Sequence, residues 1–171
     1  MCIYFMTIFS DVNIVSYGDF TLKSGEKSNY YIDMRKLISH PKTLKMIVEK
    51  IVEISPHIEC VAGVPLGGIP YAAFLSAQYD IPMVLIRNKK KSYGKGNLIE
   101  GDIDIKTPIT LIEDVITSGL SLLETIQKIE SEGYTVKEII VLIDREKDGI
   151  KNIEEKGYKI SALFKSSSLL A

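Results

Sequence analysis

The sequence contains few of the residues from which disulfide frameworks and most metal centres are built. It has only two cysteines, Cys2 and Cys60, and two histidines, His40 and His57, in 171 residues. The cysteines do not form a CxxC pair, which argues against a disulfide framework or a structural zinc site and suits a reducing cytoplasm. The HExxH, GxSxG and GxxxxGK(S/T) strings are also absent, so zinc proteases, serine hydrolases and P-loop nucleotidases have no sequence support.

The chain also lacks an excess of one charge and a long hydrophobic run. Its 21 basic and 22 acidic residues give a net charge of −1, which argues against a general nucleic-acid or membrane coat. The first nine residues are apolar but lack a basic leader and are too short to span a bilayer, so we expect buried packing there. The length fits one domain over residues 1–171, and we expect the tail from Ser166 to Ala171 to fray.

Apolar runs alternate with helical patterns from Cys60 onward. Short strands are predicted at 61–64, 83–86, 109–112, 139–143 and 161–164, with helices at 69–79 and 122–129. Earlier in the chain, the spacing predicts a hairpin from residues 20–22 and 30–34 and a helix after Pro41 that ends before Pro56. This order predicts an α/β fold with a parallel sheet flanked by helices. Ligands of such folds bind beyond the carboxyl ends of the strands.

The segment that follows the predicted strand 109–112 carries the clearest chemistry. Glu113 and Asp114 are expected to leave the strand side by side, and a loop of small and hydroxylated residues, 117–121, runs into the next helix. Backbone amides, hydroxyls and a helix N-terminus suit a phosphate, whereas the two carboxylates suit sugar hydroxyls or a magnesium ion held through substrate oxygens. The combination indicates a phosphorylated ribose. The alternative is an ordinary Ser/Thr helix cap.

Three other strand ends carry polar or glycine-rich segments. Gly67 and Gly68 provide either a second phosphate contact or a tight strand-to-helix turn. Residues 87–97 hold five cations and are either a cationic lid over a polyanionic leaving group or a solvated or nucleic-acid-binding run. Arg145 is suited to a ligand carboxylate or imide, or to a salt bridge with a neighbour. Tyr30 and Tyr31 can stack on a base, and one of the two is expected in the core.

These segments resemble the orotate phosphoribosyltransferase family of type I phosphoribosyltransferases. The string EDVITSGLS, residues 113–121, resembles the family's signature for phosphoribosyl diphosphate (PRPP). The strings FTLKSGEKSNYYID, GVPLGGIP, NLIEG and IDRE and the lysine-rich lid occur in the family's order over roughly residues 17–157. The resemblance implies a small N-terminal hood at about 1–40 and an α/β core at about 41–165. It also implies magnesium-dependent transfer of ribose 5-phosphate from PRPP to orotate, giving orotidine 5′-monophosphate and diphosphate.

The resemblance also implies roles for individual residues. Lys91, Asp114 and Arg87 would be catalytic, and Asp114 would reach the metal through substrate. PRPP would bind at Arg87, Lys91, Tyr93, Glu113, Asp114, Val115, Ile116, Thr117, Ser118, Gly119, Leu120 and Ser121. Orotate would bind at Lys23, Tyr30, Tyr31, Thr117 and Arg145, and the diphosphate loop would include Gly67 and Gly68. In the family the lid closes over the partner's site, which implies a homodimer with shared sites. We expect a cytoplasmic location from the cysteine usage and no nucleic-acid or membrane partner from the balanced charge.

The chain departs from the family pattern at several lid and loop positions. Gly67 stands where many members have a lysine, and Asn88, Ser92 and Tyr93 replace common lid residues. Two alternatives therefore accompany the orotate hypothesis: a phosphoribosyltransferase for another nucleobase, and a non-catalytic regulator that binds PRPP. Arg145 and Lys23 favour an acidic base such as orotate over the first alternative. The retained carboxylates and Lys91 argue against the second.

Overall fold

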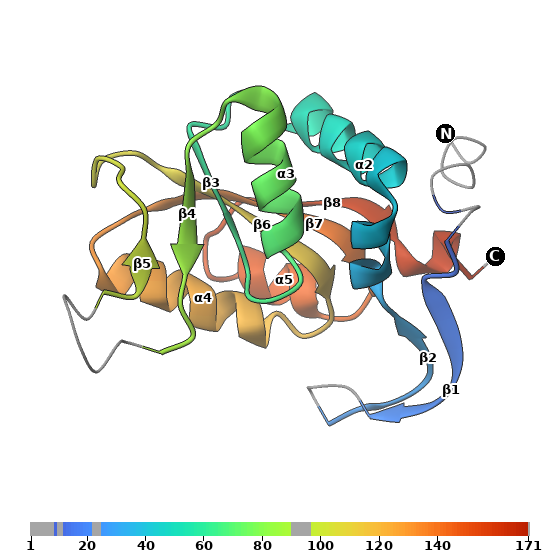
Figure 1. Cartoon of the computed structure of the whole chain (residues 1–171). Helices are drawn as coiled ribbons and strands as arrows, with labels where there is room; N and C mark the ends of the chain where they lie inside the picture. Colours follow the sequence, from blue (N-terminus) through green and yellow to red (C-terminus); the bar gives the residue numbers. More distant parts are fainter. Residues whose placement is uncertain (1–8, 10–11, 22–24, 90–96, 171) are drawn as a thin grey trace.

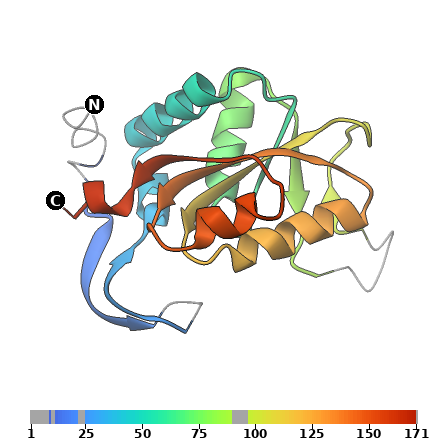
Figure 2. The same ribbon diagram turned by 180° about the vertical axis from the view of Figure 1, so that it is seen from behind.

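The structure is a computed structural model, and it describes residues 9, 12–21, 25–89 and 97–170. A two-stranded antiparallel hairpin comes first, and a six-stranded sheet with helices on both faces follows it (Figures 1 and 2). The elements are β1 (Val15–Thr21), β2 (Lys27–Ile32), η1 (Met34–Ser39), α2 (Pro41–Ile54), β3 (Cys60–Gly63), α3 (Ile69–Tyr79), β4 (Met83–Ile86), β5 (Ile99–Glu100), β6 (Ile109–Ile116), α4 (Leu120–Ser131), β7 (Val136–Asp144), α5 (Gly149–Glu154), β8 (Ile160–Lys165) and η2 (Ser166–Ser168).

The strand order of the larger sheet is β5-β4-β3-β6-β7-β8, and only β5 runs antiparallel to its neighbour. The chain moves outward from β3 to β4 on one side and from β6 to β8 on the other. The order therefore reverses between the central strands β3 and β6, and in open α/β sheets the crevice at such a reversal is the ligand site. The predicted α/β fold with a parallel sheet flanked by helices is confirmed.

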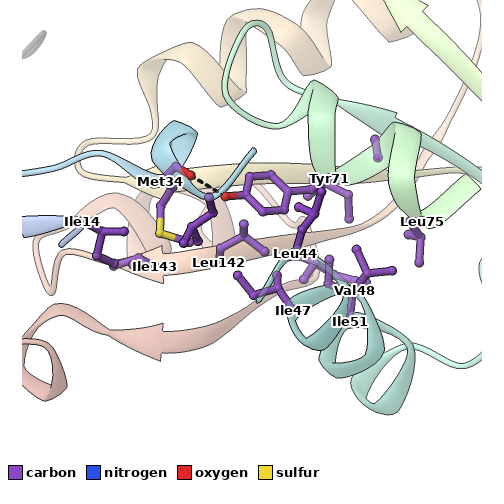
Figure 3. Close-up of a cluster of buried hydrophobic side chains, with 14 of the residues drawn as sticks. Ile14, Met34, Leu44, Ile47, Val48, Ile51, Tyr71, Leu75, Leu142 and Ile143 are labelled. Atoms are coloured by element: carbon purple, nitrogen blue, oxygen red, sulfur yellow. Dashed lines mark hydrogen bonds between the residues drawn. The ribbon is translucent and has the colours of Figure 1, made fainter. Parts of the chain in front are cut away.

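Two hydrophobic clusters cover the two faces of the sheet, because successive strand residues point to opposite sides. Helices α2 and α3 and the residues after the hairpin pack on one face, and α4 packs on the other (Figure 1). In the first cluster, the buried Tyr71 of α3 donates a hydrogen bond of 2.7 Å to the Met34 carbonyl (Figure 3). This bond fastens η1, directly after the hairpin, to the core.

Most predicted elements are present, and the differences lie at their ends. The hairpin strands start earlier than expected, at Val15 and Lys27, and Gly133 ends α4 in a left-handed conformation, with φ of 88°. The short β5 and α5 were not expected, because two and six residues are too few to show a period. The tail prediction is wrong over its first residues: Ser166 is buried and begins η2. No helix in the described part of the chain is long and apolar enough to cross a membrane.

Candidate active site at the carboxyl edge of the sheet

A pocket of about 420 Å³ lies where the reversal of strand order predicts a ligand site. It combines the loop after β3, the end of β6, the hairpin strands, η1 and the residue that follows β7. Its lining residues are Thr21, Tyr31, Ile32, Arg35, Pro65, Leu66, Gly67, Glu113, Asp114, Val115, Thr117, Ser121 and Arg145. The pocket thus brings together carboxylates, hydroxyls, a glycine loop and two guanidinium groups from segments far apart in the sequence.

The two carboxylates lie within a strand rather than after it. Strand β6 continues to Ile116, which pairs with Asp144 of β7, so the expectation that Glu113 and Asp114 leave the strand side by side is wrong. The physical reason is that β7 pairs with β6 along its whole length and supplies hydrogen bonds beyond the apolar run. Glu113 is buried and Asp114 is half-buried, yet both line the pocket.

The loop after β6 leads into α4 without a side-chain cap. Gly119, with φ of 81°, occupies the N-cap position, and no side chain caps the helix. The alternative of a Ser/Thr cap is therefore wrong, and no hydrogen bond of the Thr117 or Ser118 hydroxyl occurs among the described residues. A hollow of about 120 Å³ follows this loop and is lined by Glu113 and by residues 115–122, which include Val115, Ile116, Leu120 and Ser121. Amides, hydroxyls and a helix N-terminus converge there, as an anion site requires.

The loop after β3 packs so tightly against β6 that a side chain at either of its glycines would force a neighbouring group to move. A Cβ atom on Gly67 would lie 2.0 Å from Oδ2 of Asp114, and one on Gly68 would lie 2.0 Å from the Ile112 carbonyl oxygen. The tight strand-to-helix turn is therefore present. The same packing places the backbone of Gly67 beside the Asp114 carboxylate, in the wall of the 420 Å³ pocket.

Arg145 is the more deeply buried of the two guanidinium groups in the described part of the pocket. It is 5 % exposed, its guanidinium carbon lies 4.3 Å from the centre of the Tyr30 ring, and Nη2 donates to the Ser28 hydroxyl at 2.9 Å. Its Nε atom is buried without a hydrogen-bond partner, and no acidic side chain pairs with it among the described residues. The salt-bridge alternative for Arg145 is therefore wrong.

The two tyrosines of the hairpin have different surroundings. Tyr30 is half-buried against the core and supports Arg145, whereas Tyr31 is 36 % exposed and lines the pocket. Burial alone would raise the pKa of Tyr30, but hydrogen bonds with Arg145 and Ser166 lower it below its ordinary value. Tyr30 also lines a larger, neighbouring groove of about 730 Å³ between the hairpin and Lys147, which shares Arg145 with the smaller pocket.

Glu146, the residue after Arg145, is hydrogen-bonded to η2 near the end of the chain. Glu146 has φ of 56°, and its carboxylate accepts hydrogen bonds from the Ser167 amide at 2.7 Å and the Ser166 hydroxyl at 3.3 Å. Ser166 also helps to lower the pKa of Tyr30, so η2 lies close to Tyr30 as well as to Glu146. Neither Glu146 nor Ser166 was selected from the sequence, because no local pattern shows that the tail returns to this edge of the sheet.

Arg87 is not brought into this pocket. Its Nη1 atom lies 3.2 Å from Oε1 of Glu100, across the β4–β5 pair, and its Nε atom is buried without a hydrogen-bond partner. Three further predicted site residues, Lys23, Lys91 and Tyr93, lie outside the described residues. Conversely, Arg35 lines the pocket although it was not selected from the sequence. The only available signal was a cation two residues after Asp33 in the segment YIDMR.

Comparison with known proteins agrees with this geometry. A model of the phosphoribosyl transferase domain matches residues 37–161. The chain is 41 % identical over 163 residues to the orotate phosphoribosyltransferase of Pyrococcus abyssi, a match that covers 93 % of this chain and 90 % of that protein. It belongs to the orotate phosphoribosyltransferase family. The family member from Methanopyrus kandleri is 35 % identical over 159 residues, which cover 93 % of this chain and 86 % of that protein.

The fold is shared with a solved orotate phosphoribosyltransferase. The crystal structure of the enzyme from Aeropyrum pernix matches with a TM-score of 0.84 and 28 % identity, over 99 % of this chain and 97 % of that one. The resemblance drawn from the signature strings is therefore confirmed at the level of family and fold. The chain is an enzyme of the pentosyl-transferring class.

Proposed function

We propose that the chain transfers ribose 5-phosphate from PRPP to orotate and that the 420 Å³ pocket holds the reacting groups. The C1–O bond of PRPP breaks and its electron pair leaves with the diphosphate, while orotate N1 forms the new bond to C1. The transition state resembles an oxocarbenium ion, so the site has to stabilise the departing anion and keep water from the sugar.

The observation that carries the proposal is the buried, incompletely paired guanidinium of Arg145. A buried cation without an acidic partner is costly, and an anionic planar ligand would remove that cost by accepting the remaining N–H groups. Orotate supplies a carboxylate and an imide edge of this kind. Tyr31, in the same pocket, offers an aromatic face for the ring, and Thr117 offers a hydroxyl.

The ribose phosphate fits the last residues of β6 and the loop that follows this strand. The 5′-phosphate would bind in the hollow of residues 117–121, where the N-terminus of α4, which no side chain caps, meets the hydroxyls of Thr117 and Ser118. Glu113 and Asp114 would accept hydrogen bonds from the ribose hydroxyls. The diphosphate would then extend toward the Gly67 backbone, because Gly67 and Asp114 are in contact.

The donor set fits a magnesium ion that is bound mainly by substrate. No group of three or more His, Cys, Asp or Glu side chains converges in the described ranges, so the protein alone offers few ligands, of which Asp114 is the best placed. Magnesium keeps several waters and binds through one or two carboxylates together with substrate phosphates. When bound, it would neutralise charge on the leaving diphosphate.

The lid and the partner subunit complete the proposal. Lys91, with Arg87 and Tyr93, would lower cations onto the diphosphate of the partner's site, and Lys23 would reach the base from the hairpin. A homodimer with shared sites follows from the family's arrangement. A cytoplasmic location is supported by the cysteine usage. Burial raises the pKa of the Cys60 thiol to about 11, so this thiol stays protonated and unreactive.

The deciding experiment follows orotate absorbance with purified protein, PRPP and Mg²⁺, and repeats it without Mg²⁺ and with uracil and adenine in place of orotate. Magnesium-dependent loss of orotate alone, with orotidine monophosphate formed, is expected. Turnover of another base would overturn the orotate assignment. PRPP binding by calorimetry without turnover of any base would favour the non-catalytic regulator.

Mixing the two inactive variants Lys91→Ala and Arg145→Ala tests the shared site. Mixed dimers contain one intact site, so activity should return.

A further inference from the structure

Arg35 lies on η1 and is held in place by its own neighbours. Its Nε atom donates to Oδ1 of Asp33 at 2.7 Å, and the same oxygen accepts its backbone N–H at 3.2 Å. Nη2 donates to the Tyr31 hydroxyl at 3.3 Å. Asp33 and Tyr31 therefore set the orientation of the guanidinium before any ligand binds, which reduces the entropy lost on binding.

The guanidinium retains donors that face no protein partner. Nη1 of Arg35 makes no hydrogen bond within the described ranges, and the side chain is 46 % exposed. The residue nevertheless lines the 420 Å³ pocket together with the Pro65–Gly67 loop and Asp114. The hydrogen bond to Asp33 is the main reason why the pKa of Arg35 is raised, and the Asp114 charge contributes in the same direction. Arg35 thus lies within electrostatic reach of Asp114.

The Pro65–Gly68 loop itself has no side chain that can balance an anion. It consists of Pro65, Leu66, Gly67 and Gly68, so it offers backbone amides only. Its neighbour Asp114 is negative and would repel a diphosphate unless a cation lies close by. The other described guanidinium of this pocket, Arg145, lies against Ser28 and Tyr30 and is assigned to orotate by the proposed function.

We propose that Arg35 binds an oxygen of the diphosphate group of PRPP, as a substrate-binding residue supplied by η1 rather than by the lid. This inference rests on the proposed function, since it assigns a second ligand group within the same site. As the C1–O bond breaks and its electron pair moves to the diphosphate, the negative charge near Arg35 grows. The contact therefore strengthens toward the transition state.

The simplest competing explanation is a surface ion pair between Arg35 and Asp33. Such pairs contribute little to stability, and their loss leaves kinetics unchanged. A second explanation is that Arg35 binds the orotate carboxylate. The two explanations and the proposal predict different kinetic constants, so one set of variants separates them.

The test compares Arg35→Ala and Arg35→Lys with Lys36→Ala as a matched control. Lys36 is the next residue of η1, is exposed and donates to the Asn13 carbonyl at 2.8 Å, and it does not line the pocket. Arg35→Ala should raise KM for PRPP and the inhibition constant of diphosphate by about tenfold or more, because a charge-assisted hydrogen bond is lost. Its KM for orotate should stay within about twofold, and Lys36→Ala should match the wild type within about twofold. Arg35→Lys should fall between the wild type and Arg35→Ala, since it keeps the charge but loses the fork geometry.

Unchanged constants in Arg35→Ala would overturn the proposal in favour of the surface ion pair. A rise in KM for orotate alone would assign Arg35 to the base instead. Calorimetry with Mg²⁺ and diphosphate gives a readout that needs no turnover. If the wild type binds diphosphate without any transfer activity, the proposed function fails, while weaker binding by Arg35→Ala would still support this contact.

Discussion

Two buried charged residues, Glu138 near the start of β7 and Arg145 directly after its end, have opposite surroundings. At the amino edge, the buried Glu138 of β7 accepts hydrogen bonds from Ser55, after α2, and from Lys159 at 2.8 Å, before β8. At the carboxyl edge, the buried Arg145 has an Nε atom without a hydrogen-bond partner, and no acidic side chain forms an ion pair with it in the part of the chain that the structure describes. The protein itself satisfies the Glu138 carboxylate, whereas the Arg145 guanidinium retains capacity for a ligand.

The hydrogen bonding of a buried charge in the free protein indicates whether the residue mainly contributes to stability or to function. A buried charge that is fully hydrogen-bonded in the free protein stabilises one arrangement of the chain, and its removal costs stability. A buried charge that is left partly unpaired costs stability until a ligand binds, so its removal costs activity instead. Substitutions at the two edges should therefore have opposite profiles.

The largest effect is expected for Arg145→Met, which keeps an unbranched apolar stem but removes the charged guanidinium. Catalytic efficiency (kcat/KM) with orotate should fall by about a hundredfold or more, because the ligand's polar groups lose their partner. The melting temperature should stay equal or rise, since an incompletely paired buried cation is replaced by an apolar side chain. The measurement is orotate kinetics with thermal unfolding of the same samples. A large drop in melting temperature would mean that Arg145 is mainly structural.

An intermediate effect is expected for Gly67→Ala at the same edge. The new Cβ atom would lie 2.0 Å from Oδ2 of Asp114, so the loop or the carboxylate has to move. We expect KM for PRPP to rise by about tenfold, with KM for orotate nearly unchanged, because only the ribose and diphosphate side of the pocket shifts.

The double variant Gly67→Ala with Asp114→Ala tests whether that contact is the cause. If the clash dominates, Gly67→Ala should destabilise the protein less when Asp114 is already alanine, as measured by urea unfolding. Equal losses in both backgrounds would place the effect of Gly67→Ala elsewhere.

Much of the fold and several residues of the site could be predicted from the sequence. The apolar runs from Cys60 onward indicated the parallel strands, and the strand-end rule then placed the phosphate loop, the glycine loop and Arg145 at one edge. These features depend on local pattern and topology. The family strings added the substrate, and the matches to known proteins bear out the family.

Contacts between segments that are far apart in the chain could not be predicted from the sequence. The extension of β6 through Asp114 depends on pairing with β7, the fixing of Ser166 depends on Glu146, and the position of Arg35 depends on how Tyr71 fastens η1 to the core. Each involves residues far apart in the chain, so no local pattern reports it. The amino-edge cluster of Glu138, Ser55 and Lys159 was missed for the same reason.

The smallest effect is expected for Glu138→Gln at the amino edge, and it should appear in stability alone. Burial by itself would raise the pKa of Glu138, but the hydrogen bonds from Lys159 and Ser55 outweigh it and lower the pKa below the ordinary value. Because the folded pKa is the lower one, the charged form stabilises the protein at pH values above the unfolded pKa of about 4.3. At pH 7 the variant should lose about 1–3 kcal/mol of unfolding free energy with unchanged orotate kinetics.

The pH dependence separates this charge from a general packing effect. The stability that Glu138 contributes is lost as pH falls below the unfolded pKa of about 4.3 and through the lowered folded pKa, so the difference between the wild-type and Glu138→Gln proteins in urea unfolding should shrink progressively in acid. Glu59→Gln is the matched control, since Glu59 is exposed, pairs with Lys137 at 3.0 Å and should contribute less than about 1 kcal/mol. A gap between wild type and Glu138→Gln that persists unchanged in acid would mean that the amide is poorly packed. The contrast between Glu138 and Arg145 would then rest on Arg145 alone.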